Sequence, residues 1–72
     1  MDDIQIHDTI QAHTVEDGEQ IVVTTDDGRD HLENVVVDDC GEVIVISGYS
    51  HDTGDIARYP LDPSDFVDVW SL

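Results

Sequence analysis

Three short runs of aliphatic residues constrain the fold of this chain more than any other feature of its sequence. The runs occupy residues 21–23, 35–37 and 43–46, and Asp or Gly follows each of them within three residues. Val, Ile and Thr together number 22 of the 72 residues, whereas the helix-favouring Ala and Leu number 5. Because β-branched side chains are restricted at χ1 and suit pleated strands, the sequence predicts an all-β fold.

Local patterns place the strands and the turns along the chain. Residues 4–13 alternate between apolar and polar side chains, which is the period of a half-buried strand. A fifth strand is expected at 56–61, and Pro60, which has no backbone N–H, indicates an edge position for it. Clusters of Asp, Glu, Asn and Gly predict the interruptions. These are turns at 16–19, at Asp27-Gly28, at 38–42 and at 51–55, a bend at Glu33-Asn34 and a bulge at Gly48.

The C-terminal segment, residues 62–72, is compatible with two structures. Asp62, Pro63 and Asp65 are residue types that begin helices, as a cap, a first helical residue and an acid at the positive helix end. Residues 66–72 instead alternate in the manner of a strand. We expect one helical turn near Pro63 followed by a last strand, and a short C-terminal helix is the alternative.

The predicted order of elements, a bent antiparallel meander, a Pro-containing turn and a short final strand, resembles the Src-homology-type and Sm-like small barrels. The segment Pro-Ser-Asp-Phe-Val at 63–67 is similar to the Pro-Ser-Asn-Tyr-Val segment near the end of Src-homology domains. The Ala-Leu-Tyr-Asp-Tyr and Trp-Trp signatures of that family, and the hydrophobic-Asp-x-x-x-Asn segment of Sm-like proteins, have no counterpart here. A length of 72 residues allows one domain at most, so we expect a single domain, residues 1–72. The resemblance implies that this domain folds as an antiparallel barrel of five or six strands.

Charge is the second constraint on this chain. It has 18 acidic residues, two arginines and no lysine, for a net charge of −16, yet 39% of its residues are hydrophobic. This balance resembles that of proteins from halophilic organisms, haloarchaea in particular, which keep molar salt in their cytoplasm. No apolar stretch approaches the ~20 residues that span a bilayer, and the N-terminus lacks the basic residues and apolar run of a signal peptide. We therefore expect a soluble cytoplasmic protein with no membrane partner.

Asp52-Thr53-Gly54 matches the tripeptide that carries the catalytic aspartate of aspartic proteases. Such loops follow an apolar strand, whereas Ser50 and His51 precede this one. Asp, Thr and Gly also form turns, through short side-chain hydrogen bonds and backbone freedom. We interpret the tripeptide as a turn between two strands, so it predicts no catalytic residue.

The four histidines and the acidic clusters form no recognisable metal site. His7 and His13 share one face of the same expected strand, where a rise of ~3.3 Å per residue separates them by roughly 20 Å. His31 and His51 could approach each other only through the fold. No acidic cluster has the spacing of a calcium-binding loop, and the single cysteine, Cys40, excludes an intrachain disulfide. We expect neither a cofactor nor a metal ion.

The three aliphatic runs are apolar on both parities, whereas one-sided strands alternate apolar and polar residues. A small barrel buries one face of its sheet, so the second face must be covered by the N-terminal strand, by the C-terminal segment or by another subunit. Exposed apolar patches usually mark interfaces. We expect the interaction surface to include Val22, Val36, Ile44, Ile46, Tyr49, Phe66 and Trp70.

The function that follows is a non-enzymatic protein-interaction module with a protein partner, for which a second copy of the chain is one option. A nucleic-acid-binding small barrel is an alternative, in which bases stack on aromatic side chains. Two arginines form no basic patch, however, so nucleic acid is the less favoured partner. A metal- or aspartate-dependent enzyme is a further alternative.

Overall fold

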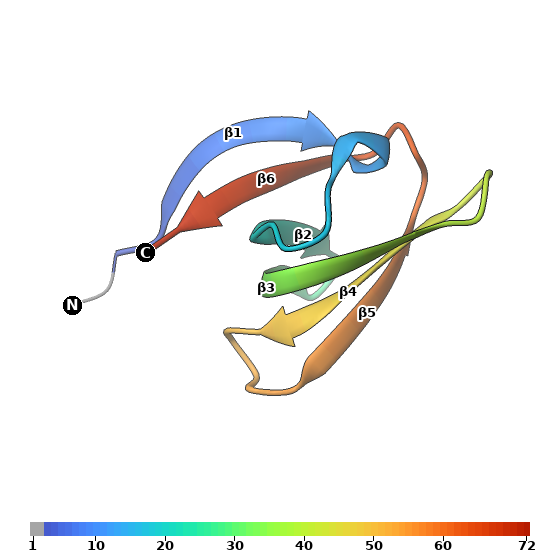
Figure 1. Cartoon of the computed structure of the whole chain (residues 1–72). Coiled ribbons are helices and arrows are strands. Elements are labelled where there is room, and N and C mark those ends of the chain that lie inside the picture. Colours follow the sequence, from blue (N-terminus) through green and yellow to red (C-terminus); the bar gives the residue numbers. More distant parts are fainter. Residues whose placement is uncertain (1–2) are drawn as a thin grey trace.

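The sheet of this protein has strands β1 and β5 at its edges, and its C-terminal strand lies inside it. The computed structural model describes residues 3–72, which form six antiparallel strands in the order β1-β6-β2-β3-β4-β5 (Figure 1). The all-β prediction is therefore confirmed. β1 and β5 each pair with a single neighbour, so the ladder is not closed. The strands are β1 (Gln5–Gln11), β2 (Ile21–Thr25), β3 (Gly28–Asp39), β4 (Ile44–Ser50), β5 (Ile56–Leu61) and β6 (Phe66–Ser71).

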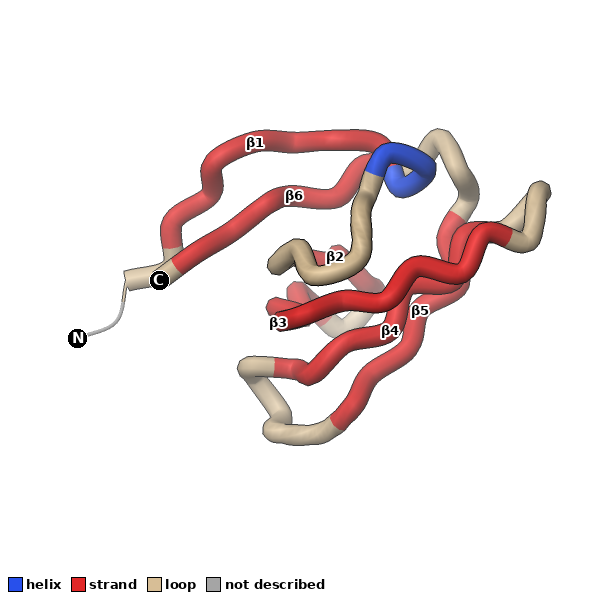
Figure 2. The backbone as a smooth tube through the Cα atoms, viewed as in Figure 1, coloured by secondary structure: helices blue, strands red, loops and turns tan. Residues whose placement is uncertain are grey.

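The only helical element within residues 3–72 is a 3-10 turn, Ala12–Thr14, which follows β1 (Figure 2). The sequence predicted strand for most of this segment. The N–H groups of Ala12 and His13 donate to the carbonyls of Asp65 and Pro63, at 2.7 and 3.2 Å, and so join the 3-10 turn to the turn before β6. No helix of the described chain is long and apolar enough to cross a membrane.

Residues 62–65 form a β-turn in place of the expected helical turn. The Asp65 N–H donates to the Asp62 carbonyl at 2.9 Å, and the Asp62 carboxylate accepts hydrogen bonds from the N–H and hydroxyl of Ser64. Such side-chain hydrogen bonds satisfy the backbone locally and compete with continuation of a helix. β6 begins directly afterwards, so the predicted last strand is confirmed and the alternative C-terminal helix is wrong.

The β2–β3 hairpin turns one residue earlier than expected. Thr25 pairs with Gly28, so Asp26 and Asp27 form the two-residue turn. Gly28 has a φ of 128°, a conformation that residues with a Cβ rarely adopt. The Asp27-Gly28 dipeptide therefore predicts the hairpin correctly. Asp27 is the last residue of the turn, however, and Gly28 is the first residue of β3. The turns expected at 16–19 and 51–55 are confirmed.

β3 bends at a bulge. Two of its residues, Asn34 and Val35, face the single residue Gly48 of β4, where the register between the strands shifts. Asn34 has a φ of 51°, in the left-handed region that Asn tolerates. A Cβ atom at Gly48 would lie 3.0 Å from the carbonyl oxygen of Glu33 and 3.1 Å from the Val35 side chain. The predicted bend at Glu33-Asn34 is confirmed. The bulge expected at Gly48 lies instead in β3, opposite Gly48. The lack of a side chain at Gly48 allows β4 to approach the bulge closely.

One hydrophobic core joins the two ends of the sheet. Side chains of both edge strands, β1 and β5, pack against it. The sheet therefore curls around the core, as the curved strands in Figure 1 show. Its buried members are Ala12, Val15, Ile21, Val23, Leu32, Val35, Ile44, Ile46 and Val67.

β2 is buried on both of its faces. Ile21 and Val23 belong to the core, and Val22, on the opposite face, is 1% exposed. Trp70 of β6 lies on the same face of the sheet as Val22, and its indole N–H donates to the carbonyls of Ile21 and Leu32 at 3.2 and 3.1 Å. Trp70 of the C-terminal strand thus covers the second face of β2, and this is one of the three coverings that the sequence allowed.

Candidate functional site

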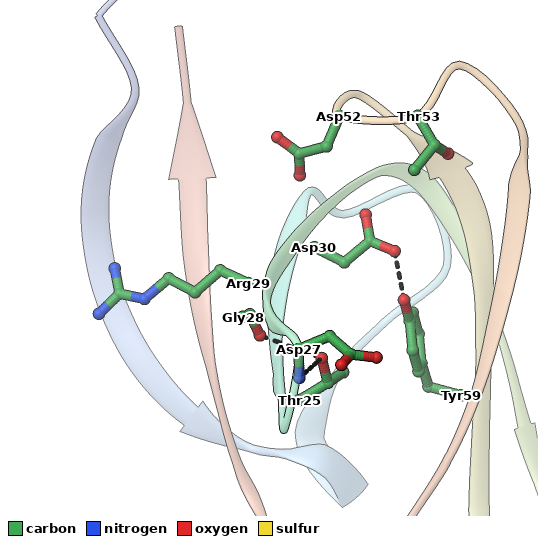
Figure 3. Close-up of a pocket in the computed structure, with 8 residues that line it drawn as sticks. All are labelled: Thr25, Asp27, Gly28, Arg29, Asp30, Asp52, Thr53 and Tyr59. Atoms are coloured by element: carbon green, nitrogen blue, oxygen red, sulfur yellow. Dashed lines mark hydrogen bonds between the residues drawn. The ribbon is translucent and has the colours of Figure 1, made fainter.

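Two hollows on the surface of this protein differ in their chemistry. The first has a volume of about 300 Å³ and lies between the β2–β3 hairpin, the β4–β5 turn and β5 (Figure 3). Asp27, Asp30 and Asp52 line it together with Tyr59, and Figure 3 shows the Arg29 guanidinium pointing away from these carboxylates. The electrostatics of this acidic hollow disfavour anionic ligands.

Asp30 is the buried acid of this hollow, with 9% of its surface exposed. Its carboxylate oxygens accept hydrogen bonds from the hydroxyls of Ser50 and Tyr59. The hydrogen bond to Asp30, together with burial, raises the pKa of Tyr59 from 10.0 to about 12. Asp30 therefore ties the hairpin to β4 and β5, and both of its oxygens already have donors.

Asp52 lies at the edge of the same hollow, within the turn that the sequence predicted. One of its oxygens accepts hydrogen bonds from the backbone N–H and from Nδ1 of His31, both at 2.8 Å. Burial raises the pKa of Asp52, but the hydrogen bonds from His31 outweigh burial and hold it below the ordinary value of 3.8. Asp30 and Asp52 thus bind different donors, unlike the proton-sharing carboxylates of an aspartic protease.

His31 and His51 meet through the fold, on the outer side of Trp70. The centroid of each imidazole ring lies 5.5 Å from that of the indole, His31 edge-on and His51 tilted. Nδ1 of His51 lies 3.8 Å from a Glu33 carboxylate oxygen. Within residues 3–72 no group of three or more His, Cys, Asp or Glu side chains is placed to hold a metal ion. Both imidazole rings therefore pack against the indole of Trp70.

The second hollow is apolar, has a volume of about 200 Å³ and lies over the bulge, on the outer side of β3, β4 and β5. Three large side chains border it, those of Val36, Tyr49 and Ile56. They are 59%, 46% and 75% exposed. We call this hollow and its three bordering side chains the apolar groove.

Four of the seven residues predicted to form an interaction surface lie in the interior and are at most 2% exposed. They are Val22, Ile44, Ile46 and Trp70. Ile44 and Ile46 belong to the core, and Val22 and Trp70 fill the second face of β2. The prediction that these four residues form an exposed surface is therefore wrong, because the curled sheet and β6 cover them.

The other three predicted residues are exposed, but only two of them lie together. Val36 and Tyr49 both border the apolar groove, whereas Phe66, at the start of β6, does not. The sequence interpretation missed Ile56, the most exposed large apolar residue of the described chain. The period of two along β5 could have identified it. Ala57 and Tyr59 pack against the core, so Ile56 lies on the opposite, outer face of the strand.

Comparison of the chain with models of protein families, with curated proteins and with solved structures gives no match. A functional assignment for this protein therefore depends on the chemistry of its own surface. In the acidic hollow, Asp30 and Asp52 already accept hydrogen bonds from groups of the protein itself. The apolar groove instead exposes large apolar side chains to water.

Proposed function

We propose that this chain is a non-enzymatic protein-interaction module and that the apolar groove is its contact site. The exposure of Val36, Tyr49 and Ile56 around one hollow is the observation that carries the proposal. Contiguous apolar surface of this kind marks interaction sites in proteins, whereas single exposed apolar residues are ordinary. Aromatic side chains such as that of Tyr49 are enriched at the centres of interfaces.

The charge of the chain makes an exposed apolar groove more significant. With a net charge of −16, most of the surface repels another acidic protein and holds water strongly. Only one acid, Glu33, is among the residues that line the groove. The groove therefore offers a partner both apolar contact area and a low density of negative charge.

The fold and the setting belong to the same proposal. The sheet is an open relative of the Src-homology-type and Sm-like small barrels, supported by a core that receives side chains from both edge strands. The setting is the cytoplasm of a halophilic cell, supported by 18 acidic residues and the lack of lysine. Molar salt screens charge and strengthens apolar contacts, so it favours docking through the groove.

A matched pair of variants tests the contact site. Ile56→Ser removes an apolar side chain from the groove, and Phe66→Ser removes one of similar exposure, 67%, outside it. The tagged proteins are purified from a halophile extract in molar KCl. We expect proteins that co-purify with the wild type to be lost with Ile56→Ser and kept with Phe66→Ser. Equal recovery with both variants, or recovery of nucleic acid in place of protein, would contradict the proposal.

A further inference from the structure

The outer side of β3, β4 and β5 extends beyond the groove and separates its charges by strand. Cross-strand pairs place nine residues there in three rows, which are Glu33–Tyr49–Ile56, Val36–Ser47–Arg58 and Asp38–Val45–Pro60. The acids of these rows are on β3, and the single cation, Arg58, is on β5. The middle strand, β4, contributes no charge. One side of this surface is therefore negative, and the other carries one of only two basic residues in the chain.

We infer that this surface docks onto the same surface of a second copy of the chain, with a twofold axis that runs along β4. The inference rests on the proposed function, because it uses the apolar groove as part of the contact. Twofold interfaces are self-complementary, so a surface that pairs with its own copy must carry groups of opposite charge on the two sides of the axis. The separation of charge onto β3 and β5, on either side of a neutral β4, meets that requirement.

The direction of the axis follows from the charges. An axis along β4 places β5 of one copy over β3 of the other, so each Arg58 lies over Val36, between Asp38 and Glu33. An axis across the strands would place β5 over β5 and β3 over β3, bringing arginine to arginine and acid to acid. Stacked sheets lie about 10 Å apart, a gap that an arginine and a carboxylate side chain bridge together from opposite sides. The first arrangement is therefore the one that charge selects.

Two apolar residues of β4 fit the same arrangement. Tyr49 and Val45 lie on β4, close to the axis, where each meets its own counterpart. Ile56 and Pro60 lie to one side on β5, over Glu33 and Asp38 on β3 of the other copy. Pro60 also lacks an N–H for a β-ladder, and proline on an edge strand opposes edge-to-edge pairing. Contact through the face is thus favoured over contact through the β5 edge.

Reversal of the two arginines separates this arrangement from a general effect of charge. Arg58→Glu and Arg29→Glu change the net charge equally, but Arg29 lies on the β2–β3 hairpin, outside these rows. By sedimentation equilibrium in molar KCl, we expect Arg58→Glu to raise the dimer dissociation constant about tenfold. We expect Arg29→Glu to leave it within about twofold of wild type, and circular dichroism checks that each variant folds.

The double variant Arg58→Glu/Asp38→Arg exchanges the charges across the two strands and should recover most of the lost association. No recovery, or equal weakening by Arg29→Glu, would overturn the assigned axis. A wild-type chain that stays monomeric across the micromolar range would overturn the second copy as partner. The proposed function would still stand in that case if co-purified proteins depend on Ile56, and it would fall separately if they do not.

Discussion

At the scale of single residues, Asp52 fastens the β4–β5 turn to β3 through two hydrogen bonds from His31. Asp52→Asn removes the charge that strengthens both bonds. Hydrogen bonds to charged groups contribute about 1.5–3 kcal/mol when buried, and the Asp52 side chain is 41% exposed. Allowing for that exposure, we expect a loss of about 1 kcal/mol in the free energy of unfolding at neutral pH, measured by denaturant titration.

The pH dependence of that loss has a defined sign. The pKa of Asp52 in the folded protein lies below its ordinary value of 3.8, so its stabilisation is present above 3.8. It disappears as the pH falls through the folded pKa, and the difference between Asp52→Asn and wild type should disappear with it. Asp55→Asn, in the same turn, is the control. A loss that stays constant into acid would show that charge on Asp52 is unimportant.

Tyr59 gives the second prediction at this scale. Its hydroxyl donates to the buried Asp30 carboxylate, which raises the pKa of Tyr59 to about 12. The chain has two tyrosines, so the absorbance titration of wild type minus that of Tyr59→Phe isolates this phenol. We expect the difference to titrate near pH 12, with stability lost as the pH rises from 10.0 towards that value. A midpoint near 10.0 would mean that the hydrogen bond to Asp30 is not formed.

The residues of these two pairs could be identified in the sequence, but the pairs could not. His31 and Asp52 are separated by 21 positions, and Asp30 and Tyr59 by 29. Their contacts depend on the pairing of β3 with β4 and of β4 with β5, which no local pattern specifies. Turn chemistry correctly favoured a turn at Asp52, because that preference arises within a few neighbouring residues.

At the scale of elements, the β3 bulge and Gly48 form a matched pair. Gly48→Ala places a Cβ atom 3.0 Å from a backbone carbonyl oxygen, so β3 or β4 must shift. We expect a loss of about 1–3 kcal/mol, typical of overpacking. Asn34→Gly should stay within about 0.5 kcal/mol of wild type, because glycine readily adopts the positive φ of the bulge. Thermal unfolding compares the two, and an unaffected Gly48→Ala would contradict the close approach.

The strands could be predicted from the sequence better than their environments. Alternation and turn residues located all six strands because both signals are local. Burial of Val22 and Trp70 depends on the position of β6 between β1 and β2, which is a property of the whole sheet. Of the three residues that border the apolar groove, Val36 and Tyr49 were predicted to be part of an interaction surface. Ile56 joins them only because β5 pairs with β4.

At the scale of the whole molecule, sixteen net negative charges repel one another within a fold whose Cα radius of gyration is 11.2 Å. The Debye length shortens from about 30 Å at 0.01 M salt to about 3 Å at 1 M, so added salt reduces this repulsion severalfold. We expect the melting temperature, followed by circular dichroism, to rise steadily with KCl concentration. A melting temperature that does not change across this range would show that self-repulsion is unimportant for folding.

The place of β6 between β1 and β2 has a consequence for synthesis on the ribosome. Among the six described strands, β1 is made first, yet its only strand partner is β6, which is made last. Ribosomes add about 5–20 residues per second, so β1 waits several seconds with its backbone hydrogen-bonding groups open to water. The meander from β2 to β5 can pair as it emerges, because its neighbours in the sheet are neighbours in the chain. Of the described strands, β1 therefore completes its backbone pairing only after all the others have been made.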